Sequence, residues 1–104
     1  MSELITFKTK RAVLRRSVTN YVKKIETILT ADEINLIELE ECVELLTQKE
    51  TELRKLDSEI ESLITDTKEL ENEIDNVQEY TDKIYLWKFK GEKILKNQNN
   101  KNNS

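Results

Sequence analysis

The chain has 104 residues and a formal net charge of −4, with no His, no Pro, one Gly and one Cys. The absence of His removes imidazole general bases and the commonest nitrogen ligand of zinc, and the lack of Pro and Gly disfavours β-turns and phosphate-binding loops. Hydrophobic residues make up 37% of the chain, which suits an elongated helical protein better than one with a large core. We therefore expect an all-α, non-enzymatic protein that needs no cofactor and no metal.

Charge falls into three blocks along the chain. Residues 1–25 contain seven Lys or Arg and one acid, residues 26–82 contain four and nineteen, and residues 83–104 contain six and one. Two basic ends therefore flank an acidic middle. Such an arrangement permits pairing between the blocks if the chain folds back on itself.

A first amphipathic helix is predicted at about residues 3–29, because apolar residues recur there at steps of three and four. The stripe contains Leu14, Val18, Tyr21 and Ile25. Its first turns carry a group of cations that can contact the phosphates of a nucleic acid, namely Lys8, Lys10, Arg11, Arg15 and Arg16. We prefer the interpretation in which these cations face the acidic second segment.

A turn and a second helix are predicted next. Thr30 and Glu33 have the spacing of a capping box, and Leu29 and Ile34 stand at the positions of a hydrophobic staple. These signals start the second helix at residue 31 and make it an antiparallel neighbour of the first. The helix is predicted at about residues 31–64, with a narrow apolar seam at Leu39, Leu46, Leu53, Leu56, Ile60 and Leu63.

A break is predicted at Thr65–Thr67, where three poor helix formers follow one another and Asp66 can cap a new helix. Against it, the seam stays in phase from Leu63 to Leu70. We favour the break because three helices of similar length can cover one another's stripes in an antiparallel, coiled-coil-like three-helix bundle. The alternative is a helical hairpin with one long, continuous second helix that oligomerises.

The third helix is predicted at about residues 67–95, with its seam at Leu70, Ile74, Val77, Ile84 and Trp87. Gly91 either lets a neighbouring helix approach closely or marks a fraying end. Nearby lysines, with Trp87 and Phe89, can form a surface for a membrane or a single-stranded nucleic acid, but we prefer to pack Trp87 near Leu39. The helical domain then spans residues 1–96, and an Asn-rich tail at residues 97–104 is predicted to be disordered.

The compartment is inferred from what the sequence lacks. No segment has the roughly 20 apolar residues of a membrane span. The first residues, MSELITFKTKR, lack the apolar run of a signal peptide, and the single Cys42 suits a reducing environment. We therefore expect an intracellular protein of the cytoplasm.

Short motifs in all three predicted helices resemble one family. Arg11 and Leu14 form an R-x-x-L pattern, Glu59–Leu63 reads E-I-E-x-L, Thr65–Asp66 forms a T-D break, and Glu69–Ile74 is followed by Y-x-D-K-I at Tyr80–Ile84. Together these motifs resemble the helical N-terminal region of Gag-like polyproteins of BEL/Pao long-terminal-repeat retrotransposons. The resemblance implies a role in assembly and supplies no catalytic residue.

Two functions follow as hypotheses. The first is a structural, protein-interaction module that associates with itself or with another helical protein, for which the seam and the resemblance argue. The alternative is a nucleic-acid-binding module that uses the basic ends of the bundle.

Overall fold

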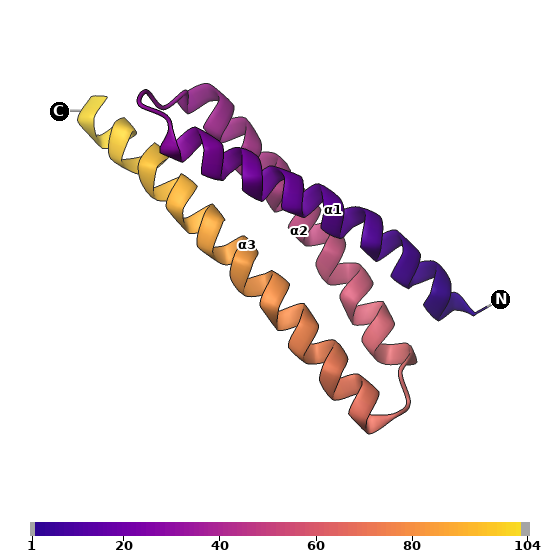
Figure 1. The fold of residues 1–104 in the computed structure, drawn as a ribbon. Helices are drawn as coiled ribbons and strands as arrows, with labels where there is room; N and C mark the ends of the chain where they lie inside the picture. The colour runs from indigo at the N-terminus through magenta and orange to yellow at the C-terminus, as the bar shows by residue number, and fades with distance from the viewer. Residues whose placement is uncertain (1, 103–104) are drawn as a thin grey trace.

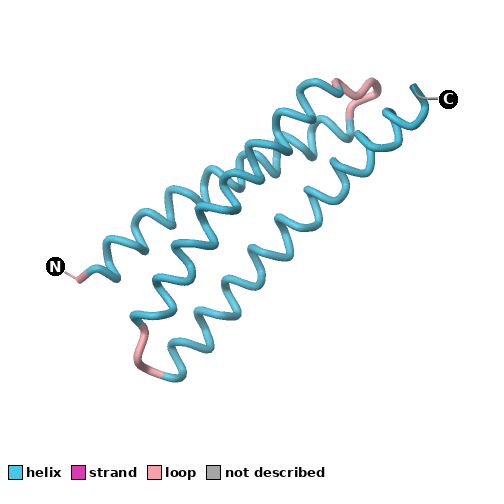
Figure 2. Tube along the Cα trace, turned by 180° about the vertical axis from the view of Figure 1, so that it is seen from behind, coloured by secondary structure: helices cyan, strands magenta, loops and turns pink. Residues whose placement is uncertain are grey.

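Three helices joined by two short loops make up the protein in a computed structural model, which describes the backbone of residues 2–102 and the side chains of residues 2–98 (Figure 1). Helix α1 spans Glu3–Thr30, α2 spans Leu36–Leu63 and α3 spans Thr67–Asn102. Helices α1 and α3 run in the same direction, with α2 antiparallel to both (Figure 2). The described part of the chain contains no strand, so the predicted all-α, three-helix bundle is confirmed.

The first loop differs from the prediction. Thr30 is the last residue of α1, and its hydroxyl donates to the carbonyl oxygens of Glu26 and Thr27. The N-cap of α2 is instead Asn35, whose Oδ1 accepts a hydrogen bond of 3.1 Å from the backbone nitrogen of Glu38. The capping-box prediction was therefore wrong, because the Thr30 hydroxyl is used inside α1 and Asn is a strong competing N-cap.

The second loop lies where the sequence predicted a break. Helix α2 ends at Leu63 and α3 begins at Thr67. Asp66 Oδ2 accepts a hydrogen bond of 2.8 Å from the backbone nitrogen of Glu69, as expected of an N-cap. The alternative of one long, continuous helix is therefore excluded, and the chain folds back here.

The apolar core occupies the half of the bundle nearest the first loop. Its buried members are Val18, Val22, Ile25, Ile28, Leu39, Cys42, Val43, Leu46, Leu53 and Ile84. Farther along, Ile60 and Ile64 are also buried. Lys88 Nζ lies 3.0 Å from Glu50 Oε1, an ion pair that aligns α3 with α2. Burial raises the pKa of the Cys42 thiol, so this residue serves as a packing group.

Gly91 lets α2 and α3 approach closely. The residue is buried, and a methyl group built on it would lie 2.7 Å from Val43 Cγ2 and 3.5 Å from Leu39 Cδ1. A Cβ atom therefore has no room here unless a neighbour moves. Of the two interpretations of Gly91, close helix approach is the one that holds.

The predicted seam positions are mostly covered. Seven are fully buried, namely Val18, Ile25, Leu39, Leu46, Leu53, Ile60 and Ile84, and seven are partly buried, namely Leu14, Tyr21, Leu56, Leu63, Leu70, Val77 and Trp87. Ile74 is the exception, because its side chain is 48% exposed. The inward position is taken by the preceding residue, Glu73, which is buried against Arg11.

The C-terminal part of α3 also departs from the prediction. The helix continues to Asn102, beyond the predicted end at about residue 95, and residues 103–104 of the predicted disordered tail lie outside the described residues. Extending an existing helix adds a backbone hydrogen bond per residue without a new nucleation step, which explains how a polar sequence can continue it. Over the described residues, no helix combines the length and the hydropathy that crossing a bilayer requires.

Candidate functional site

A buried ionic cluster joins all three helices in the half of the bundle nearest the second loop. Arg11 of α1 donates from Nη1 to Asp57 Oδ1 of α2 at 3.1 Å and from Nη2 to Glu73 Oε1 of α3 at 3.0 Å, and Nη1 also contacts Glu73 Oε2. The three side chains are each at most 8% exposed. We call this group the Arg11 cluster. It shows that Arg11 serves the interior of the protein.

The two carboxylates of the Arg11 cluster are not equivalent. The bidentate hydrogen bond from Arg11 lowers the pKa of Glu73, whereas burial raises the pKa of Asp57 despite its contact with the same guanidinium. Glu73 is therefore the main counter-ion, consistent with the raised pKa of Arg11. Asp57 has the less favourable position, because the cost of desolvating its carboxylate outweighs the attraction between that carboxylate and the Arg11 guanidinium.

Arg15 lies one helical turn after Arg11 and has no carboxylate partner among the described residues. Its guanidinium makes a cation–π contact with Tyr80 on α3, with Cζ 4.3 Å from the ring centroid. Its Nε and Nη2 atoms are buried and make no hydrogen bond within the described residues. An unsatisfied buried donor costs about 1–3 kcal/mol, so this arrangement is unfavourable unless another group supplies an acceptor. Burial, together with the nearby charge of Arg11, lowers the pKa of Arg15.

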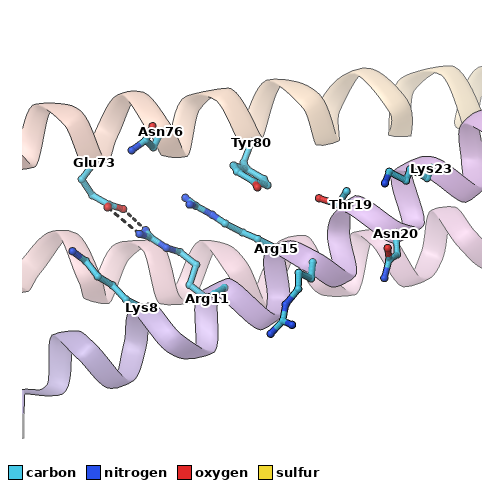
Figure 3. Close-up of a pocket in the computed structure, with 11 residues that line it drawn as sticks. Lys8, Arg11, Arg15, Thr19, Asn20, Lys23, Glu73, Asn76 and Tyr80 are labelled. Atoms are coloured by element: carbon cyan, nitrogen blue, oxygen red, sulfur yellow. Dashed lines mark hydrogen bonds and ion pairs between the residues drawn. The ribbon is translucent and has the colours of Figure 1, made fainter.

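A cleft of about 680 Å³ opens between α1 and α3 beside these residues (Figure 3). Its walls carry five cations and one acid, together with neutral polar groups and Tyr80. They are formed by Lys8, Arg11, Ala12, Arg15, Arg16, Thr19, Asn20, Lys23, Glu73, Asn76 and Tyr80. We call this feature the basic cleft. The single acid, Glu73, is already occupied by Arg11, so the unbalanced charge of the cleft is positive.

The structure divides the five cations that the sequence singled out for nucleic-acid contact. Arg11 is buried in its cluster, and Lys8 Nζ lies 3.8 Å from Glu69 Oε1. Arg15 and Arg16 line the basic cleft, whereas Lys10 is exposed and lines a groove between α1 and α2 instead. The preferred interpretation therefore holds for Arg11, although its partners come from α3 as well as α2.

Sequence reasoning overlooked Lys23 and Tyr80. Lys23 follows Arg15 by two helical turns, which places both on the same face of α1, and this spacing was available in the sequence. Tyr80 was placed on the third helix, but its contact with Arg15 depends on how α3 is oriented. No local signal reports that orientation.

A second candidate surface lies on the outer side of α3. Tyr85, Leu86 and Phe89 are large hydrophobic side chains that are 67%, 46% and 51% exposed. The rings of Tyr85 and Phe89 stack with their centroids 6.1 Å apart. Lys90 and Lys93 line a groove of about 530 Å³ beside them. We call Tyr85, Leu86 and Phe89 the α3 apolar face.

Trp87 belongs to the interior rather than to this face. It is partly buried and packs against the core, with Lys90 Nζ 4.6 Å from the centroid of its ring. This position matches the preferred interpretation of the sequence. The predicted surface of Trp87, Phe89 and lysines is therefore present only in part, because the exposed aromatic residues are Tyr85 and Phe89.

The first turns of α2 present the opposite charge. Glu40, Glu41 and Glu44 are exposed and lie one to two helical turns after Ile37 on the same face, and the Ile37 side chain is 81% exposed. We call these three glutamates and Ile37 the acidic face of α2. Figure 1 shows that the start of α2 and the later turns of α3 lie at the same end of the bundle. Among the described residues, no group of three or more acidic or Cys side chains is arranged to hold a metal ion.

Comparison of the chain with models of protein families, with curated proteins and with solved structures found no match. Inference about function therefore depends on the surfaces described above and on the motifs of the sequence.

Proposed function

We propose that this protein is a non-catalytic helical interaction module that associates with a second copy of itself through the α3 apolar face. The observation that carries the proposal is the exposure of Tyr85, Leu86 and Phe89 side by side on one helix. Single exposed apolar side chains are ordinary, but a contiguous group bordered by charges is typical of an interaction site. Aromatic residues are enriched at such interfaces.

Charge complementarity supports a second copy as the partner. The α3 apolar face is bordered by Lys90 and Lys93, and the acidic face of α2 lies at the same end of the bundle. In a two-fold dimer the same pair of contacts occurs twice, so the lysines of each copy can meet the glutamates of the other. Exposed Ile37 then adds an apolar contact at the N-terminal edge of the acidic face.

The resemblance to the helical region of Gag-like polyproteins points the same way, because it implies assembly and supplies no catalytic residue. A cytoplasmic, self-associating module is the function that combines this resemblance with the two complementary faces.

Sedimentation of the full chain at tens of micromolar tests the proposal. The unmodified protein should sediment as a dimer, and Phe89→Asp should give a monomer because it places a charge in the apolar contact. Val13→Asp is the matched control, since Val13 is a comparably exposed apolar residue on α1. Circular dichroism should show both variants folded.

A strictly monomeric unmodified protein would contradict the proposal. It would also be contradicted if the Val13→Asp variant were a monomer while the Phe89→Asp variant remained a dimer. A charge exchange gives a sharper test. Chains carrying Lys90→Glu and Lys93→Glu should associate weakly alone, yet pair with chains carrying Glu41→Lys and Glu44→Lys.

The alternative, a nucleic-acid-binding module, has a narrower basis. Arg11 is neutralised by Glu73, and Lys8 lies near Glu69, so the basic first helix presents fewer available cations than its sequence suggests. The observation in its favour is the basic cleft, where Arg15 and Lys23 make no ion pair with the described residues.

A further inference from the structure

We propose that the basic cleft between α1 and α3 binds a small anion that carries two or more phosphate groups. The cleft is separate from the α3 apolar face and the acidic face of α2, so this site is independent of the proposed self-association.

The charge balance leaves a place for an anion. Glu73, the one acid in the cleft wall, is bound by Arg11, which also contacts Asp57. Arg15, Arg16 and Lys23 line the same cleft and form no salt bridge with any described residue. Cations gathered in a concave surface raise the local concentration of an anionic ligand.

The geometry of Arg15 suits an oxyanion. Its side chain extends from α1 toward α3, where Cζ of the guanidinium lies 4.3 Å from the centroid of the Tyr80 ring (Figure 3). A guanidinium that contacts an aromatic ring in this way still has N–H groups that can donate to an acceptor. Its Nε and Nη2 have no acceptor among the described residues, and an anion in the cleft would compensate the partly desolvated charge.

The spacing of the cations sets the size of the ligand. Arg15 and Lys23 are separated by two helical turns, which corresponds to about 12 Å along α1. One phosphate group cannot contact both at once, whereas a compound with several phosphate groups can. Thr19 and Asn20 on α1 and Asn76 on α3 also line the cleft and supply neutral hydrogen-bonding groups. The volume of about 680 Å³ exceeds what a single phosphate fills.

Isothermal titration calorimetry on the full chain, in magnesium-free buffer, tests this site. The probes are inorganic tripolyphosphate, ATP, inositol hexakisphosphate and, as the single-phosphate comparison, inorganic phosphate. Tripolyphosphate should bind at least tenfold more tightly than phosphate. The stronger of ATP and inositol hexakisphosphate identifies the source of the phosphate groups as a nucleotide or an inositol headgroup.

Three variants locate the binding. Arg15→Met and Lys23→Gln should each weaken tripolyphosphate binding by about tenfold, because each removes a charge-assisted contact. Lys10→Gln is the matched control: it removes the same charge from the same helix but lies outside the cleft, and it should change the affinity less than twofold. Lys23 is exposed, so its variant remains informative even if Arg15→Met fails to fold.

Thermal unfolding gives a second readout. Tripolyphosphate should raise the melting temperature of the unmodified protein and raise that of Lys23→Gln less. The proposal is overturned if tripolyphosphate does not bind at millimolar concentration, or if Lys10→Gln weakens binding as much as Lys23→Gln. Tighter binding of a single-stranded RNA that depends equally on Lys10 and Lys23 would also overturn it, because that result describes an extended basic surface rather than a cleft.

Discussion

The two halves of the bundle bury different chemistry. Near the first loop, apolar side chains from all three helices fill the core, and Gly91 brings α3 close to Val43. Near the second loop, Arg11 and Glu73 occupy the interior, and a polar cleft opens between α1 and α3. Both halves contain the same three helices in one continuous bundle, so the difference comes from the side chains.

This difference assigns separate roles to the halves. Burial of apolar surface is favourable and does not depend on orientation, so the apolar half should supply most of the stability. A buried ion pair is a poor source of net stability, but its geometry is strict. We infer that the Arg11 cluster mainly fixes how α3 is rotated against α1 and α2, which is why Glu73 faces inward and Ile74 outward.

Leu46→Ala should have the largest effect on the apolar half. Leu46 is fully buried, and removing its side chain loses burial and leaves a cavity, at a cost of about 3 kcal/mol in the free energy of unfolding. Urea denaturation followed by circular dichroism measures this value. Val13→Ala, an exposed apolar position on α1 that lies outside the proposed dimer contact, is the control and should change the free energy by less than about 0.5 kcal/mol. Equal effects would mean that the core is elsewhere.

Unequal effects are also expected within the Arg11 cluster. Glu73→Gln should destabilise the protein by about 3 kcal/mol, because it leaves the buried Arg11 with Asp57 as its one remaining carboxylate partner among the described residues. Asp57→Asn should cost about 1 kcal/mol or less, since it also removes a carboxylate that burial disfavours. The same urea experiment compares them, and the reverse order would contradict the assignment of Glu73 as the main partner.

Gly91→Ala tests the close approach of α2 and α3. Helix propensity favours Ala by about 1 kcal/mol, but the new methyl group would meet the stiff side chain of Val43. We expect a net destabilisation of about 1 kcal/mol, since overpacking costs somewhat more than the gain in propensity. In a Val43→Ala background the same change should stabilise the protein. Stabilisation in both backgrounds would show that Gly91 only marks a tolerant helix end.

Acidification should remove the contribution of Glu73. Its pKa in the folded state lies below the ordinary value of 4.5, so its stabilising effect is present above that pH and disappears as the pH falls through the lowered value. The raised pKa of Asp57 acts in the opposite direction, because the folded state takes up that proton first. The stability difference between the unmodified protein and Glu73→Gln should therefore shrink as the pH falls below about 4.5. A constant difference in urea unfolding would argue against this pairing.

Local signals explain which parts of the fold were predictable. The break before α3 was found because Thr65, Asp66 and Thr67 are poor helix formers and Asp66 is a good cap, all within one turn. The start of α2 was misplaced because Thr30 and Asn35 are both capable caps, and tertiary packing decided between them. The inward position of Glu73 could not be read from α3 alone, since its partner Arg11 lies 62 residues away.

In the candidate sites, too, local features could be predicted from the sequence and features that depend on contacts between helices could not. The positive charge of α1 was visible in the sequence, but the loss of Arg11 to the interior and the opening of a cleft depend on how α1 and α3 meet. The exposed position of Phe89 was also undetermined, because Trp87 and Phe89 compete for the inward side and only the bundle shows that Trp87 takes it.

Native-state hydrogen exchange resolved by residue tests the division of the bundle most directly. We predict that the slowest amides lie in the apolar half, around Ile25, Leu46 and Ile84, and exchange only on global unfolding. Amides of α3 around Glu73 should exchange through a local opening of lower free energy, because fewer apolar contacts hold that half together. Equal protection of both halves, or slower exchange around Glu73, would contradict the account.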